Sequence, residues 1–120
     1  MNNPKVYKLK FYDETFNIVL GKGNYNNNGT LAILMYECTP KGKIKDIFAD
    51  LTRNIDDSEI YANETNEQFV DTNNLPREII NWLVENGIAN ETHIYGQSGF
   101  CVYPLMKFTQ EALNQMLELK

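Results

Sequence analysis

Residues that bind metals or carry nucleophilic catalysis are scarce in this chain of 120 residues. It contains one histidine, His93, and two cysteines, Cys38 and Cys101, which stand far apart in the sequence. No Cys-x-x-Cys pair and no His-x-x-His or Glu-x-x-His spacing occurs. The sequence therefore predicts neither a disulfide framework nor a zinc site, and we expect no metal and no other cofactor.

Long apolar runs are absent as well. The longest is Leu31–Tyr36, whereas a membrane-spanning helix needs about 20 apolar residues. The first ten residues, M-N-N-P-K-V-Y-K-L-K, lack the apolar stretch of a signal peptide. The hydrophobic fraction of 42% and the charged fraction of 22% are ordinary for a globular protein. We expect one cytoplasmic domain over residues 1–120, without membrane contact.

Arginine is rare, and negative charge is concentrated in the middle of the chain. The formal net charge is −5, but residues 46–91 hold every arginine, Arg53 and Arg77, together with most of the acidic residues. Residues 1–45 are lysine-rich, and the sequence around Lys8 and Lys10 is the one feature that favours nucleic acid. The acidic balance of the whole chain argues against direct nucleic-acid binding.

An acidic surface attracts basic partners by long-range steering. We therefore predict that a partner protein contacts the acidic segment D-D-S-E-I-Y-A-N-E-T-N-E, and the candidate contact residues are Asp56, Asp57, Glu59, Glu64 and Glu67. The alternative is a solvated acidic face that keeps the protein soluble.

Alternation of apolar and polar residues predicts strands over much of the chain. Residues 7–11 and 16–20 alternate on either side of Asp13-Glu14, which is typical of a β-hairpin. Residues 21–29, G-K-G-N-Y-N-N-N-G, are expected to form a loop. Residues 30–37 are apolar on both faces and predict a central covered strand, and a further strand is expected to point Ile47, Ala49 and Leu51 inward.

Helical periodicity appears late in the chain. It predicts one helix over residues 75–86, capped by Asn73-Asn74 and stopped at Gly87, and a second over residues 109–119, capped by Thr109. Trp82 lies off the apolar face of the first helix and is expected to cover a sheet edge. The fold class is therefore α+β, with a mostly antiparallel sheet of about five to seven strands packed with two helices.

The stretch H-I-Y-G-Q-S-G-F-C-V-Y-P, residues 93–104, is the nearest approach to a catalytic signature. A nucleophile elbow reads Gly-x-Ser-x-Gly between a strand and a helix, but here Phe100 stands at the final glycine position and a strand follows. A serine nucleophile also needs a base and an orienting acid, and the sequence offers no third member. We interpret the stretch as a hairpin, expect no catalytic residue, and expect that the protein is not an enzyme.

A polar cluster, F-V-D-T-N-N at residues 69–74, permits two interpretations. Asp71, Asn73 and Asn74 are typical of helix capping with an Asx-turn. Alternatively, they form a small-ligand or nucleotide site at the start of a helix, together with Tyr95 and Ser98.

Four pieces of the chain together resemble a known family. These are L-A-I-L at 31–34, A-D-L-T-R-N at 49–54, F-V-D-T-N-N at 69–74 and Q-S-G-F-C-V-Y-P-L at 97–105. In this order they resemble domain of unknown function 4313. The resemblance implies a small accessory protein of a bacterial mobile element or phage. It further implies a host protein as partner, such as a CRISPR or restriction nuclease, which the acidic surface would block.

Overall fold

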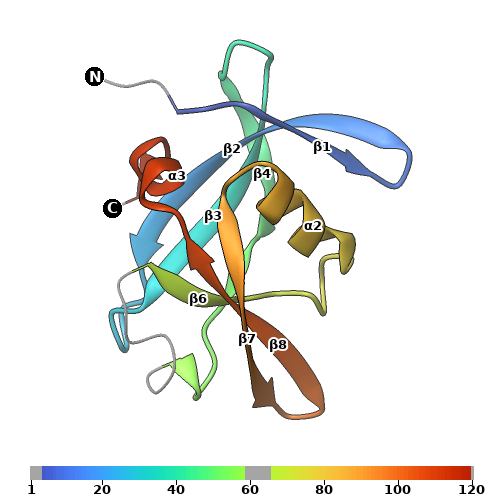
Figure 1. Cartoon of the computed structure of the whole chain (residues 1–120). Helices are drawn as coiled ribbons and strands as arrows, with labels where there is room; N and C mark the ends of the chain where they lie inside the picture. Colours follow the sequence, from blue (N-terminus) through green and yellow to red (C-terminus); the bar gives the residue numbers. More distant parts are fainter. Residues whose placement is uncertain (1–3, 59–65, 120) are drawn as a thin grey trace.

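The computed structural model describes residues 4–58 and 66–119, which form two β-sheets and two helices (Figure 1). The first sheet has the order β1-β2-β3-β4, with β9 pairing in parallel to β2; the bounds are β1 Tyr7–Phe11, β2 Glu14–Asn24, β3 Leu31–Cys38, β4 Ile44–Asp50 and β9 Leu117–Glu118. The second sheet has the order β5-β6-β8-β7; the bounds are β5 Thr52–Arg53, β6 Glu67–Val70, β7 Ala89–Ser98 and β8 Cys101–Phe108. The helices are α2 (Glu78–Glu85) and α3 (Gln110–Asn114).

The predicted α+β class, with mostly antiparallel strands packed with two helices, is confirmed, and the strands of the described residues are divided between two sheets. The chain changes sheets at Leu51. The N–H of Leu51 donates to Ile33 O in β3 of the first sheet, and the next residue, Thr52, pairs with Val70 in the second sheet. A fully buried leucine at this point lets the two sheets share one core.

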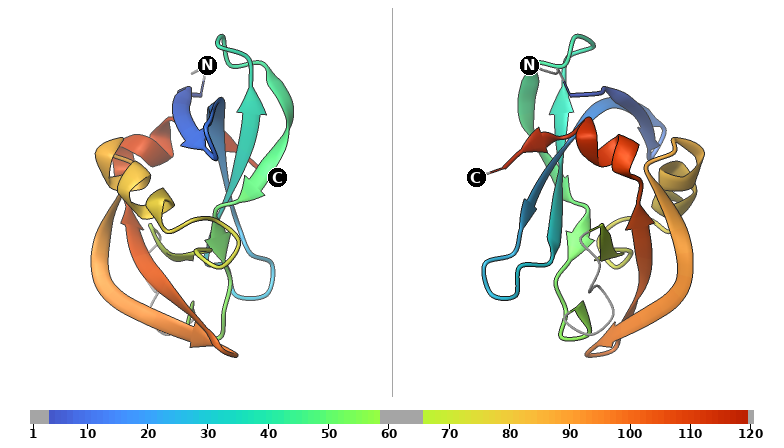
Figure 2. Two further views of the ribbon diagram at one scale, coloured as in Figure 1. Left: turned by 90° about the vertical axis from the view of Figure 1, so that its right-hand side faces the viewer. Right: turned by 60° about the vertical axis from the view of Figure 1, so that its left-hand side comes forward.

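The main core lies between the two sheets and is covered by both helices. Its members include Leu20, Ile33 and Met35 from the first sheet, Val70, Met106 and Phe108 from the second, Ile79 and Leu83 from α2, and Leu113 from α3. Figure 2 shows the tip of the β7–β8 hairpin at the lower end of the molecule and both helices well above it. The hairpin tip therefore extends beyond the region that the helices cover.

The predicted hairpin of β1 and β2 is confirmed, with Phe11 paired to Glu14 across a two-residue turn. Both turn residues have positive φ, 49° at Tyr12 and 67° at Asp13. The predicted loop over residues 21–29 is wrong in its first part, because β2 continues to Asn24. Gly21 pairs with Leu34 and with Leu117 in the sheet, and glycine suits this position because a Cβ there would lie 2.9 Å from Leu119 Cδ2.

Of the three residues predicted to point inward in this strand, Leu51 is fully buried and Ala49 packs against the core, but the prediction is wrong for Ile47. Ile47 is 61% exposed, whereas Phe48 is half-buried and packs against the core. Two register shifts between β3 and β4 explain the difference, because each shift by one residue exchanges the two faces of a strand. β3 itself is central, but only one of its faces is fully buried.

Helix α2 begins at Glu78, later than the predicted start at residue 75. Arg77 occupies the N-cap position and makes no side-chain capping bond, so the expected cap at Asn73-Asn74 is also wrong. The helix ends at Glu85, and Gly87 follows with φ +67°, as its predicted role as a helix stop requires. The indole N–H of Trp82 donates to Lys8 O at 2.8 Å, which confirms that Trp82 covers a sheet edge.

The second predicted helix, over residues 109–119, is correct only in its first half. The Thr109 hydroxyl accepts from Ala112 N at 3.1 Å and caps α3, which ends at Asn114. The chain then becomes extended as β9, whose Glu118 carboxylate lies 3.3 Å from Lys22 Nζ on β2. Neither helix of the described residues has the length and apolar content needed to cross a membrane.

Candidate functional site

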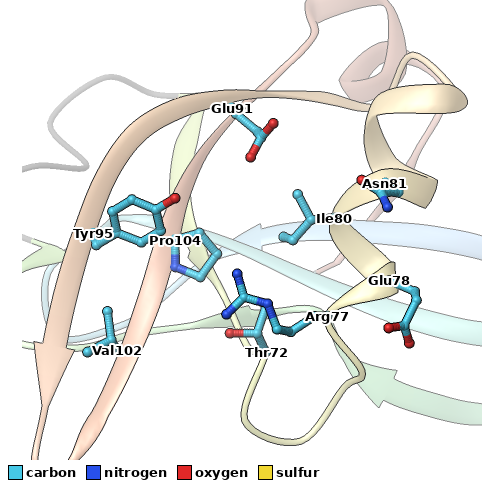
Figure 3. Close-up of a pocket in the computed structure, with 9 residues that line it drawn as sticks. All are labelled: Thr72, Arg77, Glu78, Ile80, Asn81, Glu91, Tyr95, Val102 and Pro104. Carbon is cyan, nitrogen blue, oxygen red and sulfur yellow. The ribbon is translucent and has the colours of Figure 1, made fainter.

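A groove of about 330 Å³ lies between the first turns of α2 and the outer part of the β7–β8 hairpin (Figure 3). We call it the α2–hairpin groove; it is lined by Thr72, Arg77, Glu78, Ile80, Asn81, Glu91, Tyr95, Val102 and Pro104. Its helix side is mostly polar, and its hairpin side carries an aromatic ring, a valine and a proline. This combination suits a partner with both apolar and charged groups.

The alternation of β8 explains the apolar side of the groove. Met106 and Phe108 point into the main core, and Val102 and Pro104 share their face because side chains alternate along a strand. The core ends before the hairpin does, so Val102 is 56% exposed. The core-facing side of the second sheet thus continues uncovered into the groove.

The opposite face of the hairpin is fixed by a smaller apolar cluster. Tyr103 and Leu105 pack with Phe69 and Ile55, and Gly96 lies opposite Tyr103 in the hairpin. A Cβ at Gly96 would lie 2.7 Å from atoms of both Ile55 and Phe69. The absence of a side chain there lets the hairpin approach this cluster and keeps its other face toward the groove.

Charged side chains of both signs line the groove. Figure 3 shows Arg77 reaching from the start of α2 toward the hairpin and Glu91 pointing into the groove from β7. Arg77 has no ion-pair partner within residues 4–58 and 66–119. Glu78 and Glu91 outnumber it, so the groove carries a net negative charge.

The tip of the hairpin is its most exposed apolar point. Ser98 pairs with Cys101, and the turn between them consists of Gly99, with φ +61°, and Phe100. A glycine with positive φ at the first of two turn residues is the pattern of a type II′ turn. The Phe100 side chain is fully exposed, at 104%. The hairpin predicted for residues 93–104 is confirmed, with longer strands and a tighter turn than expected.

We expect Gly99→Val to cost about 1–3 kcal/mol of folding free energy, because a β-branched side chain is strained at φ +61°. Ser98→Ala should change stability by less than about 0.5 kcal/mol, since Ser98 is exposed. Cys101→Ala should cost about 1 kcal/mol, because this half-buried side chain packs against the Tyr103 cluster. Urea unfolding of the three variants checks the order. A Ser98→Ala protein that keeps its stability but has lost its biological function would contradict the interpretation of Ser98 as part of a turn.

The polar residues predicted to hold a small ligand are engaged with one another. Asp71 is 3% exposed, and its carboxylate accepts from Asn74 N at 3.2 Å and from Asn74 Nδ2 at 2.8 Å. Arg53 Nη1 lies 3.9 Å from the same carboxylate, and Asn73 is exposed. These bonds are those of an Asx-turn, which was the first of the two interpretations, but the turn lies before α2 and does not cap it. Tyr95 lines the α2–hairpin groove, whereas Asp71, Asn73, Asn74 and Ser98 do not.

The acidic residues predicted to bind a partner are divided. Glu59 and Glu64 lie outside the described residues. Asp56 is exposed, and Glu67 is half-buried in β6. Asp57 Oδ2 accepts from Gln97 N at 3.1 Å, which brings the start of the acidic segment against β7 close to the hairpin tip. Sequence reasoning missed this neighbourhood, because the two segments are 40 positions apart.

The scarce histidine and cysteine side chains lie in different surroundings. His93 is exposed and has φ +64° at an irregularity in the pairing of β7 with β8. Cys38 is buried, and burial raises the pKa of its thiol, so the reactive thiolate is scarce at neutral pH. Among residues 4–58 and 66–119, no three His, Cys, Asp or Glu side chains gather where they could share a metal ion.

Comparison with known proteins gives one match. No curated protein and no solved structure matches this chain significantly. The family described as Domain of unknown function (DUF4313) matches residues 19–119, which include the second sheet, both helices, the residues that line the α2–hairpin groove and the first sheet except β1 and the start of β2. The match covers most of the chain and confirms the resemblance found in the sequence. The chain therefore belongs to the family of domain of unknown function 4313.

Proposed function

We propose that this chain is a non-enzymatic domain that binds another protein through the α2–hairpin groove and the neighbouring hairpin tip. The observation that carries the proposal is the exposure of three large apolar side chains on one hairpin, 54% at Tyr95, 104% at Phe100 and 56% at Val102. Exposed apolar groups gathered in one place and edged by polar residues mark interaction sites. Aromatic residues in such a place supply the anchors that dominate binding energy.

The charge around the groove indicates the chemistry of the partner. Glu78 and Glu91 line it, Asp57 lies against β7, and Asp56 is exposed beside Asp57. A partner that offers an apolar recess surrounded by lysine or arginine would complement this surface. Asp56 and Asp57 thus enter the proposal through the contact of Asp57 with β7 near the hairpin tip, and not as lining of the groove.

The finer proposal is that the partner is a host nuclease and that the protein is an accessory factor of a mobile element or phage. Its support is physical: nucleases bind DNA in basic channels, and an acidic protein competes for such a channel. The test is DNA cleavage by a restriction or CRISPR nuclease in the presence of this protein. Inhibition should weaken in Asp56→Lys and Glu91→Lys but not in Asp46→Lys, an equal charge change at an exposed site on β4.

The broader proposal is tested by photo-cross-linking in cells of the source organism. A photoreactive amino acid is placed at Phe100 in one variant and at Ile47, exposed on the first sheet, in the other. We expect a discrete protein adduct from position 100 and a weaker one or none from position 47. Equal adducts from both positions would reject the hairpin as the binding surface.

A second candidate function is small-molecule binding in the same groove. Its volume of about 330 Å³ lies within the range of small-ligand sites, and Tyr95 and Arg77 offer a stacking face and a cation. A thermal-shift screen against nucleotides and organic anions tests this function. A ligand at about 100 times its dissociation constant should add about 2.7 kcal/mol of stability. A shift that Tyr95→Ala abolishes would favour the small-molecule function over the protein partner.

A further inference from the structure

A second groove, on the other side of α2, points to a binding site for an extended peptide. We propose that the part of the β1 edge at Lys10, beyond the point that Trp82 covers, takes up such a peptide as an additional β-strand, in a groove of about 350 Å³ between β1 and α2. We call it the β1–α2 groove; it is lined by Leu9, Lys10, Phe11, Tyr12, Pro76, Glu78, Ile79, Asn81, Trp82 and Glu85. This site does not depend on the proposed function of the hairpin.

The direction of the backbone groups in β1 follows from its turn. The two-residue turn makes Phe11 and Glu14 a hydrogen-bonded pair, so the N–H and C=O groups of Leu9 and Phe11 point toward β2. Those of Lys8 and Lys10 must then point away from the sheet. The hydrogen bond that Lys8 O accepts from the Trp82 indole confirms this direction.

Lys10 therefore presents its backbone N–H and C=O along the edge of the first sheet. Within residues 4–58 and 66–119, no backbone or side-chain group of another element bonds to either of them. β1 stands at the end of the order β1-β2-β3-β4, so no other strand in the described part of the chain pairs with this edge. Unpaired groups of this kind bind an extended chain by β-augmentation, in which the main chain supplies affinity.

The side chains of the groove select what that peptide carries. Leu9, Ile79 and Trp82 are buried and form an apolar floor, so a bulky apolar side chain fits beneath the new strand. Glu78 and Glu85 stand on the helix side against a single cation, Lys10. The preferred occupant is an extended segment with an apolar residue and, two positions away on the same face, a lysine or arginine.

The turn at the end of β1 supports a role for this edge. Tyr12 has φ +49° and its ring is 80% exposed, although Asn-Gly is the favoured sequence of a two-residue turn with positive φ at both positions. Its ring stacks edge-on against Phe11, with the two centroids 4.4 Å apart, and forms one wall of the groove. A residue that is costly for the turn is thus placed where it contacts a bound peptide.

The test uses a defined probe, the capped peptide Ac-Thr-Lys-Val-Phe-Val-Lys-Thr-amide, titrated into the whole protein and followed by amide chemical shifts and calorimetry. We expect saturable shifts of the Lys10 and Tyr12 amides and of the Trp82 indole. The same peptide N-methylated at both valines should not bind, because it lacks the N–H groups that pair with Lys10. Failure of the unmodified peptide to shift these signals at about 1 mM would overturn the proposal. The dissociation constant would then exceed about 1 mM, which corresponds to a binding free energy weaker than about −4 kcal/mol.

Two charge reversals separate the two grooves. Glu85 lines only the β1–α2 groove and Glu91 only the α2–hairpin groove, and both are exposed. Glu85→Lys should weaken peptide binding at least fivefold, by about 1 kcal/mol, whereas Glu91→Lys should leave it unchanged. The reverse pattern, or equal binding of the N-methylated peptide, would place the peptide elsewhere and overturn the proposal. Binding of the hairpin partner should respond to Glu91→Lys only, so the two proposals can fail separately.

Discussion

Replacing Gly96 by alanine is expected to destabilise the protein by about 1–3 kcal/mol, and replacement by valine by more. The new Cβ would lie 2.7 Å from Ile55 Cδ1 and from the Phe69 ring, closer than carbon atoms normally approach. Phe69 is fully buried, so its ring cannot move aside without disturbing β6. Urea unfolding at equilibrium measures the loss.

A matched control is available three positions further along the hairpin. Gly99 has open space around a new Cβ, so Gly99→Ala is strained only by its φ of +61° and should cost about 1 kcal/mol. Shortening the contact partner by Ile55→Val should recover part of the loss in Gly96→Ala, as expected for side chains in contact. A Gly96→Ala protein as stable as the original would show that the hairpin does not lie against Ile55 and Phe69.

Phe100→Asp is expected to reduce affinity for the protein partner at least about tenfold while leaving the fold intact. A fully exposed phenylalanine contributes little to the stability of the fold. At an interface, by contrast, the loss of an aromatic anchor typically costs about 2 kcal/mol or more of binding free energy. The measurement is titration calorimetry with the cross-linked partner once it is purified, alongside the melting temperature. Ile47→Asp is the control, since it removes another exposed apolar side chain from the first sheet. Equal losses in the two variants would contradict a specific role for the hairpin tip.

Much of the fold could be predicted from local sequence patterns. The hairpin of β1 and β2, the stop at Gly87 and the Thr109 cap each depend on a few neighbouring residues, and all three are present. The errors arose where a distant segment decides the outcome. Residues 117–118 satisfy a helical pattern, but β2 offers them a strand partner. Ile47 faces outward because bulges between β3 and β4 shift the register, and no local pattern reveals them.

The candidate site was only partly visible in the sequence. The pattern of β8 predicted a strand, and Tyr95 was already a candidate residue. The sequence did not show that the core ends at Met106 while the strand continues outward to Cys101. It likewise did not reveal that Asp57 meets Gln97, because that contact depends on how β7 packs against a segment far from it in the chain. Asp71 was a candidate ligand-binding residue because a carboxylate that bonds within a turn and one that binds a ligand give the same sequence signal; in the structure it bonds Asn74.

Hydrogen–deuterium exchange of the protein, free and bound to its partner, tests the central claim most directly. It locates the interface without any substitution, by the slower exchange of covered backbone amides. We expect binding to slow exchange in residues 77–81 at the start of α2 and in residues 94–104 of the hairpin, and to leave β3 and β4 unchanged. Protection confined to β3 and β4, with residues 94–104 exchanging as in the free protein, would contradict the account.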